Sequence, residues 1–137
     1  MKLAIITDQH FGARKGADYI HGYFKKFYDN IFFPYLEKNK IDTIVDMGDT
    51  FDNRRNIDLA TLEWAKKNYY DRLQAMGITV HTIVGNHTAY YKDTNEINTV
   101  ELLLKEYDNV EVYAEPTTIN LGGLDILLLP WINEENK

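Results

Sequence analysis

Three short apolar runs, rich in β-branched residues, are each followed directly by a group of oxygen and imidazole donors. The runs span Leu3–Thr7, Thr43–Met47 and Thr79–Val84, and such runs are typical of strands buried in a parallel sheet. The donor groups are Asp8-Gln9-His10, Gly48-Asp49-Thr50-Phe51-Asp52 and Gly85-Asn86-His87. In an open α/β sheet, ligands bind beyond the carboxyl ends of the strands, where residues far apart in sequence converge. We therefore expect an α/β fold with a metal site at that edge of the sheet.

The segments between these runs have helical periodicity. Apolar residues recur every three or four positions from residue 20 to residue 35, which predicts a helix that buries one face. The predicted buried positions are Ile20, Phe24, Phe27, Ile31 and Tyr35. Pro34 is expected to kink this helix or to end it early.

Two further helices are predicted. One runs from about Asp58 to Met76 and ends at Gly77. Its apolar positions are Leu59, Leu62, Tyr69, Leu73 and Met76. The other runs from Asp93 towards Tyr107, because Asp93 and Glu96 have the spacing of a capping box.

The remaining residues favour strands. These are predicted at Val110–Tyr113, Thr117–Leu121 and Leu124–Leu129, and Gly122-Gly123 suits a tight hairpin between the last two. A chain of 137 residues is long enough for one packed core and too short for two ordinary domains. Because the chain stops soon after Leu129 with no helix to cover the last apolar run, we expect residues 1–137 to be a single incomplete domain.

The composition excludes several classes of function. The chain has no cysteine, so a metal site must use Asp, Asn, Glu and His, which suit Mn²⁺, Mg²⁺, iron or Zn²⁺. No run approaches the roughly 18 apolar residues of a membrane span and no signal-peptide pattern is present, so we expect a cytosolic protein with no membrane partner. The net charge of −6 argues against a generally basic surface, although acidic metal ligands contribute to that charge. Basic residues close behind the motifs fit either solvated charge or nucleic-acid contacts: Arg14, Lys15, Arg54, Arg55 and Lys92.

The first two motifs offer charged donors for a cation. Asp8 and His10 lie two positions apart, so in an extended segment both side chains point to the same side and can share one cation. When an Asp and a His with this spacing occur in isolation, they more often cap a turn. Gly48 permits a tight turn before Asp49, whose two carboxylate oxygens suit a bridge between cations roughly 3.5–4 Å apart.

The third motif combines a neutral ligand with a proton donor. Asn86 offers a carbonyl oxygen. If Asn86 points at a metal, its neighbour His87 points elsewhere and could face a substrate phosphate that it protonates or stabilises. Turn chemistry is the alternative for both residues when the motif is taken alone. Three such motifs, in this order and at three strand ends, favour the metal site.

Three other polar residues are interpreted as structural. His81 lies inside a predicted strand and is expected to be a hydrogen-bonded sheet residue. His21 is expected to be a partly exposed helix residue. Asp46, near the end of its strand, is expected to pair locally or to orient a neighbour.

These motifs resemble the first three of the calcineurin-like metallophosphoesterases, which read D-x-H, G-D-x-x-D and G-N-H. Residues 8–12 and 48–52 resemble the D-x-H-x-G and G-D-x-F-D forms of the SbcD-type nucleases, whereas the Ser/Thr phosphatase branch reads G-D-x-V-D-R-G. Residues 129–136 resemble bacteriophage relatives of the same nucleases. The resemblance implies a metallophosphoesterase core, with a mostly parallel sheet flanked by helices and cut before the second half of a β-sandwich.

The resemblance also implies a function. The chain would belong to a Mn²⁺-dependent nuclease, with Mg²⁺ as the other candidate metal, that acts on DNA ends in double-strand-break repair and recombination. Asp8, His10 and Asp49 would hold one cation, and Asp49 and Asn86 the other. His87 would be catalytic, assisting the leaving group without binding metal. The implied partners are DNA, an ABC-type coiled-coil ATPase and a second copy of the nuclease, in the cytoplasm of a bacterial or phage-infected cell.

The chain departs from the family pattern at two places. Thr88 stands where the family has an acidic residue after G-N-H, which bears on the orientation of His87. No histidine follows His87, whereas the family adds three later histidines to its metal shell. We therefore expect an N-terminal fragment that binds metal weakly and cleaves poorly.

Two other functions remain open at this point. The three motifs do not set the substrate, so a phosphoesterase for small phosphodiesters or phosphoproteins fits them equally. The helices predicted near residues 58–76 and 94–107 could instead dimerise through Leu62, Tyr69 or Leu103, for which core packing is the alternative.

Overall fold

A four-stranded parallel sheet forms the centre of the computed structural model, which describes residues 2–11, 18–48, 50, 59–84, 89–91, 94–98 and 104–130. The strands lie in the order β1-β2-β3-β6 and every neighbouring pair is parallel. Their bounds are Ala4–Ile6 (β1), Thr43–Asp46 (β2), Thr79–Ile83 (β3) and Val110–Tyr113 (β6). The predicted parallel strands are confirmed, and the carboxyl ends of β1 and β2 lie at the same edge of the sheet.

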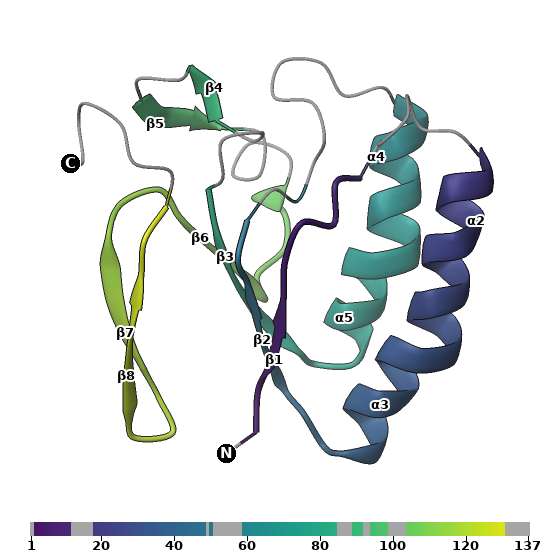
Figure 1. Ribbon diagram of the computed structural model, residues 1–137, viewed down its shortest axis with the longest axis horizontal. Coiled ribbons are helices and arrows are strands. Elements are labelled where there is room, and N and C mark those ends of the chain that lie inside the picture. The colour runs from purple at the N-terminus through teal and green to yellow at the C-terminus, as the bar shows by residue number, and fades with distance from the viewer. Residues whose placement is uncertain are drawn as a thin grey trace.

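Two long helical segments cover one face of this sheet (Figure 1). The first consists of α2 (Asp18–Phe27), a π-helical turn η1 (Tyr28–Phe32) and α3 (Phe33–Lys38). The second consists of α4 (Leu59–Ala65), a π-helical turn η2 (Lys66–Tyr70) and α5 (Asp71–Ala75). Both lie where the periodicity of the sequence predicts a helix.

The π-helical turn η1 changes which face of the first helix is buried. In a π turn the hydrogen bonds run from residue i to residue i+5, as between the Phe33 N–H and the Tyr28 carbonyl. Tyr28 and Phe33 are consequently both buried. Three positions predicted to be buried are exposed instead: Phe27, which precedes η1, and Ile31 and Tyr35. Phe24 packs against the core as predicted, and the side chain of Ile20 lies outside the described residues.

Pro34 does not end the first helix, so that alternative of the prediction is wrong, whereas the kink stays a prediction. It lies in the first turn of α3, directly after η1, and the helix continues to Lys38. The helical conformation is continuous up to this proline, since Phe32, directly before α3, already has a φ of −69° and a ψ of −58°.

The second helix ends at Gly77 as predicted. Gly77 has a φ of +71°, its N–H donates to the Gln74 carbonyl at 3.1 Å, and the Ile78 N–H donates to the Leu73 carbonyl at 3.0 Å. This pair of bonds is the Schellman motif.

Some of the apolar positions predicted for the second helix are buried, and those at its ends are exposed. Tyr69 and Leu73 are fully buried as predicted, so Tyr69 belongs to the core of this chain and not to a dimer surface. Leu59 and Met76 are exposed, contrary to prediction, since both lie at the ends of the helix.

Two apolar clusters lie on opposite faces of the sheet. Successive side chains of a strand point to opposite faces, so Ile44 packs against the helices and Val45 against a hairpin. That hairpin consists of β7 (Thr117–Leu121) and β8 (Leu124–Leu128), which pair antiparallel. Gly122 and Gly123 turn it with φ values of +61° and +90°, so the predicted hairpin is confirmed.

The helix predicted from Asp93 is wrong over residues 94–98. Those residues form β5 (Thr94–Asn98), which pairs antiparallel with β4 (Ala89–Tyr91). The capping-box spacing was a local signal, and pairing with β4 outweighs it. Leu104 and Tyr107, at the end of the predicted helix, are buried in the main core.

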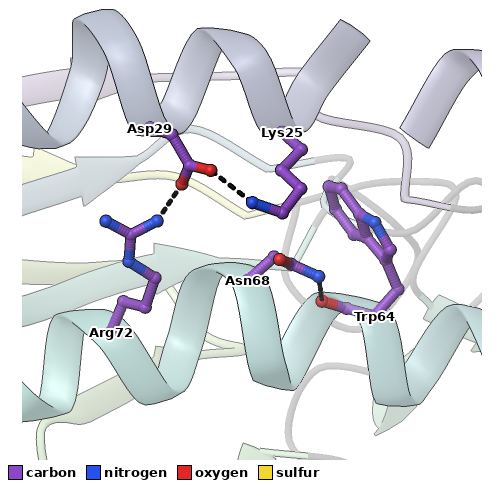
Figure 2. Close-up of polar contacts among 5 residues, drawn as sticks. All are labelled: Lys25, Asp29, Trp64, Asn68 and Arg72. Carbon is purple, nitrogen blue, oxygen red and sulfur yellow. Dashed lines mark hydrogen bonds and ion pairs between the residues drawn. The ribbon is translucent and has the colours of Figure 1, made fainter. Parts of the chain in front are cut away.

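The two helical segments are joined by charged contacts (Figure 2). Asp29 receives hydrogen bonds from Lys25 of its own helix and from Arg72 of the other. The Arg72 guanidinium also lies 4.2 Å from the centre of the Phe33 ring. Such partly exposed pairs each contribute at most about 1 kcal/mol, so packing and not charge holds the helices together.

Among the described residues, none of the helices has the length and apolar character needed to cross a membrane.

Candidate metal centre

The segment that follows β1 alternates between the core and the solvent. Gln9 and Phe11 are 5% and 1% exposed, whereas the side chains of Asp8 and His10 are 55% and 28% exposed. The Phe11 ring packs among four other aromatic rings at centroid distances of 5.6 to 6.4 Å: Tyr28, Trp64, Tyr69 and Tyr70. The two buried side chains therefore leave Asp8 and His10 at the carboxyl edge of the sheet.

Asp8 and His10 approach each other, but not through an extended backbone. Their φ values are +54° and +48°, in the left-handed region that residues other than glycine rarely adopt. The His10 Nε2 lies 3.4 Å from the Asp8 Oδ1. The expected meeting of the two side chains is thus found, and the expected extended geometry is wrong. Each left-handed residue costs on the order of 1 kcal/mol, which the surrounding contacts must offset.

The segments that follow β1 and β2 are bonded together through their backbones. The Asp8 N–H donates to the Gly48 carbonyl at 3.1 Å, and the Phe11 N–H donates to the Thr50 carbonyl at 2.8 Å. Gly48 has a φ of +108°, a conformation that favours glycine. Both sequence neighbours of Asp49 are therefore bonded to the segment that carries Asp8.

A buried hydrogen-bond network lies beneath these segments. Asp46 is fully buried. Its Oδ2 accepts hydrogen bonds from the Gln9 Nε2 at 2.9 Å and from the Thr50 hydroxyl at 3.2 Å. Its Oδ1 accepts a hydrogen bond from the Gly48 N–H at 3.1 Å. The Tyr28 hydroxyl donates to the Gln9 Oε1 at 2.6 Å. The expectation that Asp46 orients neighbours is confirmed.

Burial dominates the electrostatics of this network. It raises the pKa of Asp46 from 3.8 to about 7, against the hydrogen bonds from Gly48, Thr50 and Gln9, which lower it. Burial, together with the Asp46 carboxylate, also raises the pKa of the Tyr28 hydroxyl, which therefore stays protonated and acts as a hydrogen-bond donor.

Of the five predicted site residues, the structure describes Asp8 and His10. Asp49, Asn86 and His87 lie outside the described residues, as does Thr88. The basic residues singled out in the sequence lie outside them as well: Arg14, Lys15, Arg54, Arg55 and Lys92. Within the described ranges, no group of three or more Asp, Glu, His or Cys side chains is close enough to hold a metal ion.

The two other histidines have the following surroundings. His81 pairs through Nδ1 with the Tyr113 hydroxyl at 2.8 Å on the neighbouring strand, as expected of a sheet residue. His21 is only 7% exposed and stacks on Trp64 at 4.6 Å between ring centroids. The expectation of a partly exposed His21 is wrong, because the face of the first helix that carries Tyr28 also buries His21.

The Asp8–His10 pair fits a divalent cation. Two atoms bound to one such ion at roughly 2.0–2.2 Å can lie no more than about 4.4 Å apart, and the observed 3.4 Å satisfies that limit. A carboxylate oxygen and an imidazole nitrogen are also the donors that Mn²⁺ and Zn²⁺ accept in proteins. Both side chains are partly exposed at the strand end, where an ion can enter.

Comparison with known proteins identifies the family. A family model described as calcineurin-like phosphoesterase matches residues 1–131. The chain belongs to this family. Exonuclease subunit 1 of Enterobacteria phage T4 is 40% identical over 138 residues. The match takes in 99% of this chain and 40% of the phage protein, so the chain spans less than half of that relative.

Membership of the calcineurin-like phosphoesterase family confirms the α/β metallophosphoesterase core and implies the use of a divalent metal. The sequence reasoning found the exposed donors and missed two of the buried residues beneath them, Gln9 and Tyr28. One signal was present: Gln9 and Phe11 alternate with Asp8 and His10, which is the pattern of a segment with one buried side.

Proposed function

We propose that this chain forms part of a metal-dependent phosphodiesterase that acts on DNA ends, as an exonuclease and endonuclease subunit in double-strand-break repair and recombination. One observation carries the proposal: the chain is 40% identical along nearly its whole length to a phage exonuclease subunit. The Asp8–His10 pair at the carboxyl edge of the sheet supports it, because this edge is where open α/β sheets bind ligands.

The proposed metal ligands are Asp8, His10, Asp49 and Asn86. Asp8, His10 and Asp49 would hold one cation, and Asp49 and Asn86 the other, with Asp49 as the bridge. The backbone bonds from Asp8 to Gly48 and from Phe11 to Thr50 support the first group, because they tie the neighbours of Asp49 to the segment that carries Asp8. When bound, the cations would supply an acidic water and neutralise phosphate charge.

The remaining catalytic role is proposed for His87. A histidine beside the scissile phosphate can protonate the leaving oxygen, which lowers the barrier to breaking the P–O bond. Its position directly after Asn86 in sequence would put it next to the second cation without making it a ligand. Replacement of His87 by Asn should therefore reduce the turnover number while the affinity for metal stays unchanged.

A nuclease assay separates this function from a general phosphodiesterase. The protein, as its gene encodes it, is incubated with end-labelled duplex DNA and, separately, with bis(p-nitrophenyl) phosphate, each with Mn²⁺. We expect cleavage from the DNA ends and loss of that cleavage in Asp8→Ala. The matched control is Asp108→Asn, which alters an exposed carboxylate in the turn before β6, at the opposite edge of the sheet. Hydrolysis of the small diester with intact DNA would refute the nuclease assignment and favour a small-substrate phosphoesterase.

The metal and the partners are proposed on the same basis. We propose Mn²⁺ as the activating metal, with Mg²⁺ as the alternative, and calorimetric titration with each ion would decide between them. The relative is named a subunit, which supports a partner for this chain too. We propose an ABC-type coiled-coil ATPase and a second copy of the nuclease, acting with DNA in a bacterial or phage-infected cell. Light scattering of the purified protein with and without such an ATPase would test both contacts.

A further inference from the structure

We propose that Gln9, Asp46 and Tyr28 form a positioning unit that holds Asp8 and His10 in the arrangement that binds a metal ion. The proposal rests on the function proposed above, because it concerns the same site. All three residues are buried, with 5%, 0% and 3% of their surfaces exposed, so they act on the metal site from beneath it.

Gln9 is the central residue of this unit. It lies between Asp8 and His10 in sequence, and both ends of its side-chain amide are used. Its Nε2 donates to Asp46 on β2, and its Oε1 accepts from Tyr28 on the first helical segment. Because both ends of the amide are hydrogen-bonded, the amide cannot rotate without breaking both bonds. The two partners belong to different elements, so the bonds fix Gln9 relative to both β2 and the first helical segment.

The backbone on either side of Gln9 needs such a restraint. Asp8 and His10 both have left-handed φ values, which persist in proteins only where the surroundings enforce them. An anchored Gln9 between them fixes the two peptide units that join it to its neighbours. The 3.4 Å approach of the His10 Nε2 to the Asp8 Oδ1 follows from that fixed backbone.

Asp46 extends the restraint to the second segment of the site. Its carboxylate accepts the Gly48 N–H and the Thr50 hydroxyl as well as the Gln9 amide. One buried carboxylate therefore joins the segment after β1 to the segment after β2. Side chains that orient metal ligands commonly change metal affinity by about tenfold to a hundredfold when replaced.

A pair of matched tyrosine variants tests the proposal. Tyr28→Phe removes only the hydroxyl that holds Gln9 and keeps the ring in the core. Tyr107→Phe removes an equivalent hydroxyl, which donates to the Asp71 Oδ1 at the same 2.6 Å but precedes β6 at the far edge of the sheet. The dissociation constant for Mn²⁺ is measured by calorimetry and the stability by urea denaturation in EDTA, on the protein as its gene encodes it.

We expect Tyr28→Phe to weaken Mn²⁺ binding by about tenfold and Tyr107→Phe to leave it unchanged, although both variants lose a tyrosine hydrogen bond of the same length. Equal Mn²⁺ affinities in the two variants and the parent would overturn the positioning role. If the parent itself binds no Mn²⁺, the proposed function fails and this inference fails with it. The Mn²⁺ affinity of the parent protein therefore distinguishes failure of the proposed function from failure of the positioning role.

A charge-conserving exchange provides a rescue. Gln9→Glu places two carboxyl groups together, and Asp46→Asn places two amide donors together, so each single variant should weaken Mn²⁺ binding. The double variant restores one acid and one amide, because the carboxylate now at position 9 can accept from both the Tyr28 hydroxyl and the amide now at position 46. We expect it to bind Mn²⁺ more tightly than either single variant. A double variant that binds Mn²⁺ no more tightly than the tighter-binding single variant would contradict the proposal.

Discussion

The buried carboxyl group of Asp46 should make the stability of the metal-free protein fall as the pH rises. Burial raises its pKa to about 7 in the folded protein, against 3.8 as the ordinary value. The folded state therefore holds a proton between these two pKa values that the unfolded state has released. Stability from this group is fully present below pH 3.8 and is lost as the pH rises through about 7.

The size of the effect follows from the two pKa values. A shift of about 3 pKa units corresponds to roughly 4 kcal/mol over the whole range, and the part lost between pH 5 and pH 8 is roughly 2.5 kcal/mol. Asp46→Asn removes the titrating group. The free energy of unfolding of the parent minus that of Asp46→Asn should therefore fall by roughly 2.5 kcal/mol from pH 5 to pH 8.

Urea denaturation in EDTA at both pH values measures this difference. Asp108→Asn is the matched control, since it makes the same replacement at an exposed carboxylate outside the buried network. A difference that stays constant or grows with pH would refute the reasoning. It would mean that the hydrogen bonds from Gly48, Thr50 and Gln9 outweigh burial and keep Asp46 ionised throughout.

Three further outcomes are expected. Leu73→Ala, in the centre of the core, should lower the free energy of unfolding in urea by about 3 kcal/mol, whereas Leu59→Ala, at an 82% exposed position, should change it by less than about 0.5 kcal/mol. Gly77→Ala should destabilise by about 1 kcal/mol because of its positive φ, while Gly22→Ala in α2, where an added methyl group meets no atom within 4 Å, should stabilise by about 0.5–1 kcal/mol in the same assay. Mn²⁺ at a hundred times its dissociation constant should raise the stability over that in EDTA by about 2.7 kcal/mol, and Asp8→Ala should abolish the rise; an equal rise in both proteins would place the metal elsewhere.

The sheet could be predicted from sequence because its signal is local and repeated. β2 and β3 are short β-branched runs, and each is preceded by a helical segment of ordinary length, which is the pattern of a parallel α/β sheet. The hairpin between β7 and β8 was equally accessible, since Gly122 and Gly123 supply the positive φ values that its turn needs. In each case the local sequence and the tertiary structure favour the same conformation.

The errors in the helices have a different cause. A 3.6-residue period cannot anticipate a π turn, which places Phe33 five residues after Tyr28 with both side chains buried. The same effect buries Asn68, Tyr69 and Tyr70 in succession in η2. Tyr28, Tyr69 and Tyr70 of these two turns pack around Phe11, so the surroundings of the turns depend on residues from several elements.

The geometry of the metal site could not be predicted from local sequence rules. The period-2 rule predicts that Asp8 and His10 point to the same side only if the strand continues, and the strand ends at Ile6. Their side chains meet because two left-handed residues bend the chain, a conformation that local propensity disfavours. The disfavoured conformation is held by Gln9, whose partners lie 19 and 37 residues away in sequence. Sequence patterns therefore locate the donors of a site of this kind, whereas their geometry depends on distant buried residues that carry no motif. Replacement of those buried residues is accordingly the sharpest test of the site.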